Sequence, residues 1–189
     1  MAGDPQILWR RLDLPGHDAC RIWQDSSGQG LDGVAVWLDA AGPAHLSYLV
    51  VCDDVWRTRS ARVQGRVGQR EITLSIQRSP EGDWRIGGEE IPDLHGLQDI
   101  DLGFTPATNT LPIRRMRASG SDGGDLAAAW LDAADWRLKL LPQTYRLAGD
   151  IWHYASPRHD FAADLSVNTD GFVTDYPGLW IEEGADGKP

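Results

Sequence analysis

Strict alternation of apolar and polar residues marks the segment Glu71-Ile72-Thr73-Leu74-Ser75-Ile76-Gln77. Successive side chains of a β-strand point to opposite faces, so the three apolar side chains share one face and the polar ones share the other. The pattern returns at residues 161–167, and Thr169-Asp170-Gly171 then indicates a hairpin into the next strand. The sequence therefore predicts strands with one buried face.

Turn-forming residues recur at short intervals between such segments, as in Ala41-Gly42-Pro43, Gln64-Gly65 and Pro80-Glu81-Gly82-Asp83. This spacing favours a barrel or roll over βαβ units, which need helical crossovers. Leu46 to Cys52 is apolar on both sides, as a central strand would be. We predict a mainly β, single-domain antiparallel barrel or β-roll with about a dozen or more short strands and little helix. It would span residues 1–189, with flexible ends at about 1–5 and 183–189.

Composition narrows the functional classes. The net charge of -10 argues against general nucleic-acid binding, which needs a basic face. Two cysteines fit neither a disulfide framework nor a zinc pattern, and no apolar run is long enough to span a membrane as a helix. No nucleotide, zinc-protease or α/β-hydrolase motif occurs, so we expect no cofactor and no metal. The first residues, Met-Ala-Gly-Asp-Pro-Gln, do not show a basic region followed by an apolar stretch, and we expect a cytoplasmic protein.

One local region reverses the overall charge. From Arg57 to Arg78 there are six arginines and a single acid, Glu71. Long charged side chains usually cover surface and pair with acids elsewhere. Alternatively, these arginines attract an anionic ligand.

Polar groups are concentrated between residues 99 and 115, in Asp-Ile-Asp-Leu-Gly-Phe-Thr-Pro-Ala-Thr-Asn-Thr-Leu-Pro-Ile-Arg-Arg. If residues 99–104 form a strand, the Asp99 and Asp101 carboxylates share a face, roughly 6.5 to 7 Å apart. Residues 105–110 then read as a polar turn. Its hydroxyl and amide groups suit a polyhydroxyl ligand, and two arginines that follow offer forks for a carboxylate or phosphate. These groups belong to Thr105, Thr108, Asn109, Arg114 and Arg115.

The same segment resembles the signature of a bacterial family of uncharacterised proteins described as putative glycolipid-binding. Further pieces agree in order, namely Asp83-Trp84, Leu141-Pro142-Gln143-Thr144-Tyr145-Arg146 and Asp175-Tyr176-Pro177-Gly178-Leu179-Trp180. The resemblance implies a β spiral roll, remotely similar to the half-barrels of lipoprotein-localisation factors, that handles lipid or glycolipid. It also favours a strand at 126–131 followed by a turn, although the alanines of residues 125–136 favour helix. We expect a strand with a short turn of helix.

Aromatic and polar side chains near the C-terminus add candidate ligand contacts. On an extended segment Gln143 and Tyr145 share a face, with Arg146 beside them, and Tyr154 and Trp152 share another. Tyr176 and Trp180 flank a Pro-Gly turn that would hold their rings rigidly. Trp84, Trp152 and Trp180, among nine tryptophans, have polar neighbours and could line a cavity or fill the core.

Three functional interpretations follow. We favour a protein that binds a small amphiphile, either a glycolipid or an anionic lipid. The second is a hydrolase of sugar conjugates in which Asp99 and Asp101 act as the acid pair, but neighbouring arginines would keep both carboxylates ionised. The third is an interaction scaffold without a ligand. The candidate ligand-binding residues are Asp99, Asp101, Thr105, Thr108, Asn109, Arg114, Arg115, Gln143, Tyr145, Arg146, Tyr154, Tyr176 and Trp180.

Overall fold

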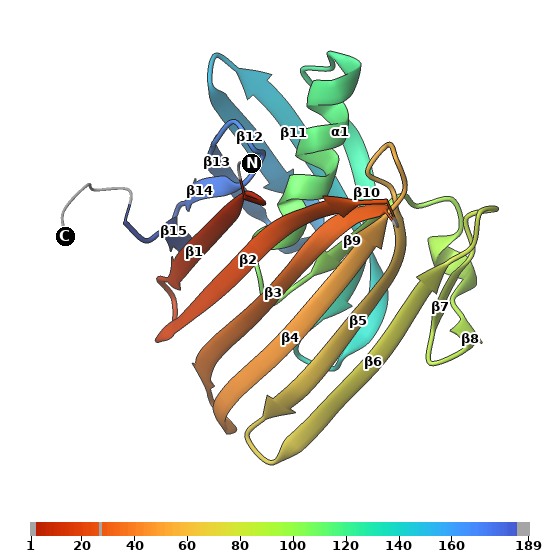
Figure 1. Ribbon diagram of the computed structural model, residues 1–189, viewed down its shortest axis with the longest axis vertical. Helices are drawn as coiled ribbons and strands as arrows, with labels where there is room; N and C mark the ends of the chain where they lie inside the picture. Colours follow the sequence, from red (N-terminus) through yellow and green to blue (C-terminus); the bar gives the residue numbers. More distant parts are fainter. Residues whose placement is uncertain (1–2, 27, 185–189) are drawn as a thin grey trace.

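The structure is a computed structural model that describes residues 3–26 and 28–184. Over these residues, 15 strands form one sheet in the order β8-β7-β6-β5-β4-β3-β2-β1-β15-β14-β13-β12-β11-β10-β9 (Figure 1). The first eight strands are β1 (Gln6–Arg11), β2 (Gly16–Asp25), β3 (Gly28–Asp39), β4 (Gly42–Cys52), β5 (Thr58–Val67), β6 (Arg70–Arg78), β7 (Trp84–Ile86) and β8 (Glu89–Glu90). The other seven are β9 (Asp99–Leu102), β10 (Gly123–Asp132), β11 (Arg137–Ala148), β12 (Ile151–Ser156), β13 (Phe161–Val167), β14 (Val173–Tyr176) and β15 (Trp180–Glu182). Helical segments are limited to η1 (Pro92–Leu94), η2 (Ala107–Asn109), α1 (Thr110–Ser119) and η3 (Pro157–His159).

Neighbouring strands in this sheet are antiparallel, apart from the parallel pair β9 and β10. The two ends of the chain meet in the middle of the sheet, where Trp9 of β1 pairs with Glu182 of β15. The sheet's edges are β8 and β9, so it stays open. The prediction of a mainly β half-barrel with little helix is confirmed.

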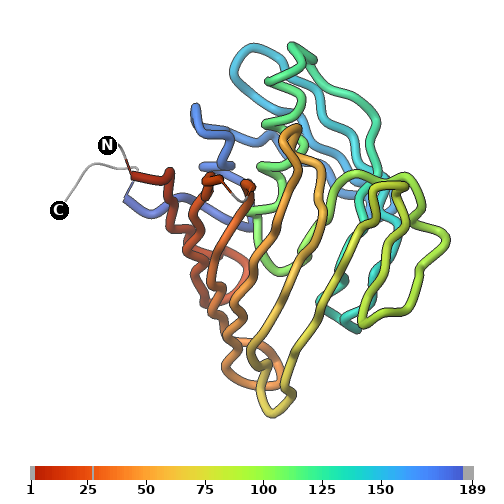
Figure 2. The backbone as a smooth tube through the Cα atoms, turned by 45° about the vertical axis from the view of Figure 1, so that its right-hand side comes forward, coloured from red at the N-terminus to blue at the C-terminus, as the bar shows by residue number. Residues whose placement is uncertain are grey.

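The sheet bends around α1, so that the β1–β6 part and the β10–β13 part lie on either side of the helix (Figures 1 and 2). The inward faces carry the core, which includes the fully buried rings of Trp9, Tyr48, Trp84 and Trp152. Trp84 and Trp152 therefore belong to the core. In β6, Ile72 and Ile76 are buried while the residues between them are more exposed, as the alternating pattern predicts.

The edge strand β9 is fastened to the opposite half of the sheet through Thr58 at the start of β5. The Thr58 amide donates to the Gln98 carbonyl at 2.9 Å, and the Thr58 hydroxyl accepts from the Ile100 amide at 3.1 Å. These two bonds bring β9 across the inner side of the roll. They position the segment that follows β9, which carries most of the candidate site.

The segment after β9 differs from the predicted polar turn. Residues 107–109 form the 3-10 helix η2, and α1 continues from Thr110 to Ser119. Pro112 lies in the first turn of α1, where a missing amide hydrogen costs no helical hydrogen bond. The helix ends at Gly120, whose positive φ of 68° is the usual left-handed C-cap.

Two further predictions concern the chain around β10 and its ends. Residues 126–131 lie within β10, so the expected strand is confirmed and the helical alternative is wrong. The expected flexibility of residues 1–2 and 185–189 lies outside the described residues. Inside them, the Pro5 carbonyl accepts from the Ile22 amide at 2.9 Å, and the Glu183 amide donates to Leu8 at 2.7 Å.

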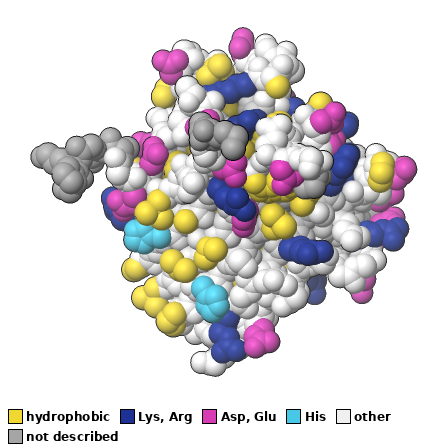
Figure 3. Space-filling model, in the orientation of Figure 1, with side chains coloured by type: hydrophobic (Ala, Val, Ile, Leu, Met, Phe, Trp, Pro, Cys, Tyr) yellow, Lys and Arg dark blue, Asp and Glu magenta, His cyan; other side chains and the backbone are white. Residues whose placement is uncertain are grey.

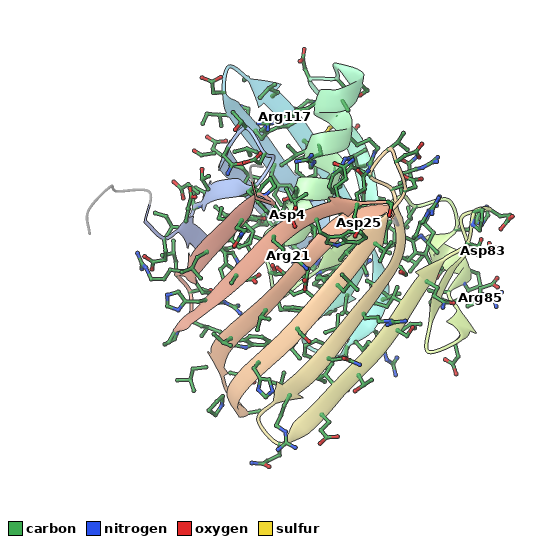
Figure 4. The ribbon with its side chains drawn as sticks, in the orientation of Figure 1. Asp4, Arg21, Asp25, Asp83, Arg85 and Arg117 are labelled. Atoms are coloured by element: carbon green, nitrogen blue, oxygen red, sulfur yellow. The ribbon has the colours of Figure 1, made fainter. Side chains whose placement is uncertain are left out.

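The outer face of the sheet mixes apolar and paired charged side chains. Exposed apolar residues gather over β1 and β3, among them Leu8, Val34, Val36 and Leu38 (Figure 3). On β2, Arg21 pairs with Asp4 at 3.2 Å and with Asp32 at 2.9 Å (Figure 4). No helix in the described ranges has the length and apolar character needed to cross a bilayer. Both cysteines, Cys20 and Cys52, are buried and free.

Candidate functional site

A pocket of about 180 Å³ opens on the concave side, between the β9–η2 segment and strands β10 to β15. The β9–η2 segment supplies polar groups, and the strands supply mostly rings. It is lined by Asp101, Gly103, Thr105, Pro106, Asn109, Trp130, Leu141, Tyr154, Ser156, His159, Phe161, Tyr176, Leu179 and Trp180.

Asp101 is the acidic group of this pocket. The Gln143 side-chain amide donates to the Asp101 carboxylate at 2.6 Å and to the Tyr154 phenol oxygen at 3.1 Å. Because Gln143 is buried on β11, it fixes both groups from behind. The remaining hydrogen-bonding capacity of Asp101 can be used by a ligand.

The pKa of the Asp101 carboxyl is unusually high. Burial raises its pKa to about 6, against a smaller lowering by the Gln143 hydrogen bond, and the nearby Asp99 carboxylate raises it further. Within the described part of the chain, no arginine or lysine forms an ion pair with Asp101. The expectation that arginines hold both carboxylates ionised is therefore wrong for Asp101.

Asp99, two residues earlier, is bound by an arginine. The Arg115 guanidinium holds it bidentately, at 2.6 and 2.5 Å. Burial raises the pKa of Asp99, and the Arg115 fork opposes that effect. Asp99 does not line the pocket. An inverting hydrolase needs one protonated and one ionised carboxyl on opposite sides of the scissile bond, and Asp99 is not placed for that role.

Aromatic rings pack against one another along the wall of the pocket. Tyr154 lies edge-on to Tyr145 at 5.1 Å and to Tyr176 at 5.9 Å, and Phe161 lies 5.9 Å from Tyr176. On the other side, Trp130 meets His159 at 4.9 Å. Rings in mutual contact lose little freedom when a ligand binds, so the wall is preorganised.

A second buried polar cluster supports the pocket from below. The Thr105 hydroxyl donates to Asp18, and the Tyr48 hydroxyl lies 3.1 Å from each Asp18 oxygen. Burial raises the pKa of Asp18 to about 7, although both hydrogen bonds lower it. Gly33 makes room for this cluster, because a Cβ there would lie 2.3 Å from the Tyr48 hydroxyl.

The structure brings six of the predicted site residues to the pocket and holds two directly behind it. Gln143 contacts Asp101, and the Tyr145 hydroxyl donates to Asn109 at 2.7 Å. The six that line the pocket are Asp101, Thr105, Asn109, Tyr154, Tyr176 and Trp180.

The other predicted residues have partners elsewhere. Arg114 donates to the Asp170 carbonyl and stacks over Trp56 at 4.3 Å. The Thr108 hydroxyl accepts from the Leu102 amide at 3.1 Å. Arg146 is exposed and pairs with Asp125 at 2.9 Å. Asp99 and Arg115 are occupied by each other.

Several pocket residues are absent from the sequence-based set, including Trp130, Ser156, His159 and Phe161. The ring at 130 reads as core from sequence, yet it is only partly buried and faces the pocket. Asp18 could have been noticed, because it shares its strand face with the buried Cys20 and Ile22. Nothing local in the sequence marks His159 or Phe161.

Comparison with known proteins gives a family and a fold. A family model described as putative glycolipid-binding matches residues 6–181. A DUF1089 family protein from Pseudomonas aeruginosa is similar, with a TM-score of 0.74 and 28% identity over 87% of this chain and 91% of that chain. A β-barrel-like DUF1849 protein from Brucella abortus shares the fold, with a TM-score of 0.53, 10% identity and coverage of 94% and 93%. No curated protein matches the chain significantly.

Proposed function

The chain belongs to the family described as putative glycolipid-binding, and from this premise we propose that the pocket at Asp101 binds the hydroxyl-rich head of an amphiphile. The observation that carries the proposal is the Asp101 carboxylate, which forms no ion pair with any described residue and lies against a wall of aromatic rings. The Asp101 oxygens accept hydroxyl donors, and the Tyr154 phenol adds a second polar contact. The faces of Trp130 and Trp180 can cover the apolar C–H faces of a sugar ring.

The size of the pocket limits what enters it. A volume of 180 Å³ is below the range of about 300–1,000 Å³ that is usual for small-molecule pockets. This suits a single ring-sized head group and is too small for a long acyl chain as well. The pocket is open at its mouth, so the apolar part of the ligand would leave along the concave surface.

The charge of the pocket selects among head groups. Arg114 and Arg115, which would favour an anionic head, are engaged outside the pocket. In the described residues, no arginine or lysine lines the pocket, and Asp101 would repel an anion. We therefore propose a neutral sugar head over an anionic lipid head for this site.

Titration with an alkyl glycoside below its micelle concentration tests the proposal. Because Trp130 and Trp180 line the pocket, we expect a saturable change in tryptophan emission. Asp101→Asn keeps the shape but removes the charged acceptor, so affinity should fall about tenfold or more, since hydrogen bonds to charged groups contribute about 1.5–3 kcal/mol. The exposed Asp93→Asn is the matched control and should bind like the wild type.

Two further ligands, one with a cationic head and one with an anionic head, test which head-group charge the pocket prefers. An alkyl trimethylammonium of equal chain length tests whether the carboxylate and rings prefer a cation. At this pocket an anionic alkyl phosphate should give the smallest Asp101-dependent change in tryptophan emission, because the Asp101 carboxylate repels it. If the glycoside produces no saturable change in emission or melting temperature, or binds Asp101→Asn as well as wild type, the proposal is wrong and the scaffold interpretation is preferred.

A further inference from the structure

A hollow of about 500 Å³ lies at the end of the sheet where β5 begins and β6 ends, and it shares no lining residue with the pocket at Asp101. We call it the arginine hollow. Asp83 and Arg85, on the β7 side of this end of the sheet, are labelled in Figure 4. The hollow is lined by Asp53, Arg57, Arg59, Arg78, Ser79 and Pro80.

Arg59 reaches the hollow because of a β-bulge. Cys52 of β4 pairs with Thr58 and Val51 pairs with Ser60, which leaves Arg59 as the extra residue. The bulge turns Thr58 inward, where it fastens β9, and leaves Arg59 exposed. Bulges commonly redirect a side chain in this way at functional sites.

The charges around the hollow do not balance. Asp53 is taken by Arg57, whose guanidinium lies 2.7 Å away, and it also accepts two backbone amides. Asp83 is taken by His95 at 2.8 Å and Ser79 at 3.1 Å. Arg85, on the flank, pairs with Glu90 at 2.6 Å.

Two guanidinium groups remain without a carboxylate among the described residues. Arg59 forms no ion pair or hydrogen bond there, although it also borders a neighbouring hollow that is lined by Asp25, Asp53 and Asp54. Arg78 donates through its Nε to the Leu97 carbonyl at 2.6 Å, which leaves its terminal nitrogens for other contacts. Burial and then repulsion from Arg57 lower the pKa of Arg78. Two carboxylates, Asp53 and Asp99, act on Arg78 in the opposite direction. Asp53 is paired with Arg57, and Asp99 is paired with Arg115.

We propose that the arginine hollow binds a phosphate-type anion, with Arg59 and Arg78 as the two forks. A guanidinium matches a pair of phosphate oxygens bidentately, and two guanidinium groups without an ion-pair partner among the described residues favour a multivalent anion over a single carboxylate. The net charge of -10 repels anions at long range, so binding would rest on these short contacts. The phosphate could belong to a soluble ester or to a lipid head group. This site is independent of the proposed sugar pocket.

Calorimetric titration with inorganic pyrophosphate at low ionic strength tests the site. We expect saturable binding to the wild type that is about tenfold weaker in Arg59→Gln, since one charge-assisted fork is lost. Arg59 is exposed, so the variant should fold normally. Arg62→Gln is the matched control, because Arg62 is exposed on the same strand with the same charge but does not line the hollow. Arg78→Lys, which keeps the charge and loses the fork, should also weaken binding.

The outcomes separate specific binding from general electrostatics. Equal weakening by Arg59→Gln and Arg62→Gln, or no saturable binding to the wild type, would overturn the proposal. Sedimentation with phosphatidylcholine vesicles containing phosphatidic acid identifies the source of the phosphate. Vesicle binding that pyrophosphate displaces supports a lipid head group, and pyrophosphate binding without vesicle binding supports a soluble ester.

Discussion

Two aspartates on β9, separated by one residue, have opposite surroundings. Asp99 accepts both arms of Arg115 and is closed off from ligand. Asp101 accepts a neutral amide and faces a pocket. The ion pair with Arg115 offsets the desolvation free energy of burying the Asp99 carboxylate. Asp101 has no such ion pair, so its desolvation still destabilises the ligand-free protein. Asp101 is therefore the residue at which binding and stability should compete.

Replacing Asp101 by Asn should stabilise the fold at alkaline pH. The folded pKa of about 6 lies above that of an unfolded aspartate, so the folded state holds the proton more tightly. The unfavourable contribution of the ionised carboxylate is thus complete above pH 6, shrinks as the pH falls, and vanishes near pH 4. Because the side chain is partly exposed, we expect a gain of about 1–3 kcal/mol at pH 8. Urea unfolding of both proteins between pH 8 and pH 5 measures it.

The pH dependence distinguishes this mechanism from a packing effect. Asp18 titrates in both proteins, so its contribution cancels from the difference between them. A difference in unfolding free energy that stays constant from pH 8 to pH 5, or a loss of stability at pH 8, would contradict the burial argument. Asp93→Asn should show no pH-dependent difference from wild type.

Local sequence identifies polar residues of the site better than its rings. Asp101 and Asn109 are predicted because so many polar groups in one short segment have few structural uses, and Tyr154 is predicted from its face on an extended segment. Trp130 and Phe161 are missed, because the sequence around an aromatic residue does not show whether its ring packs in the core or faces a pocket. The partners of Arg114 and Arg115 lie far along the chain or on another element, which residue spacing does not reveal.

At the level of elements, the alternation of apolar and polar residues predicts strands correctly but does not predict helix α1. Glu71–Gln77 and Phe161–Val167 follow the period of two, and both lie in strands. Residues 105–110 read as a polar turn from sequence, yet Pro106 precedes η2 and α1 begins at Thr110, with Pro112 in its first turn. Packing of Leu111, Ile113 and Met116 into the core stabilises the helix.

The hairpin between β13 and β14 reaches α1 only because residue 171 is glycine. Its φ is +94°, and a Cβ there would lie 2.8 Å from Cγ of Arg114. Gly171→Ala should therefore cost about 2–3 kcal/mol from backbone strain and the displaced Arg114. Gly149→Ala is the control, since it also has a positive φ of +62° but nothing within 4 Å. Equal loss in both variants, measured by thermal unfolding, would show that the contact with α1 contributes nothing.

The arrangement of the whole molecule depends on pairings between distant segments. β1 pairs with β15, and β9 pairs in parallel with β10 across the η2–α1 segment. Alternation defines the faces of each strand but not its neighbours, so the order of the sheet could not be read from the sequence. The spacing of the turns favours a barrel or roll, and only the resemblance to a known family indicates the half-barrel.

The attachment of β9 to β5 should control the pocket at Asp101, because β9 carries that residue. Thr58→Val keeps the shape of a fully buried side chain but leaves the Ile100 amide without its acceptor. An unsatisfied buried amide costs about 1–3 kcal/mol, and the loss should fall on the β9 edge. We expect faster hydrogen exchange at Ile100 and weaker glycoside binding, while Thr58→Ser retains both. Unchanged exchange at Ile100 in Thr58→Val would mean that the parallel pairing with β10 holds the strand without help from β5.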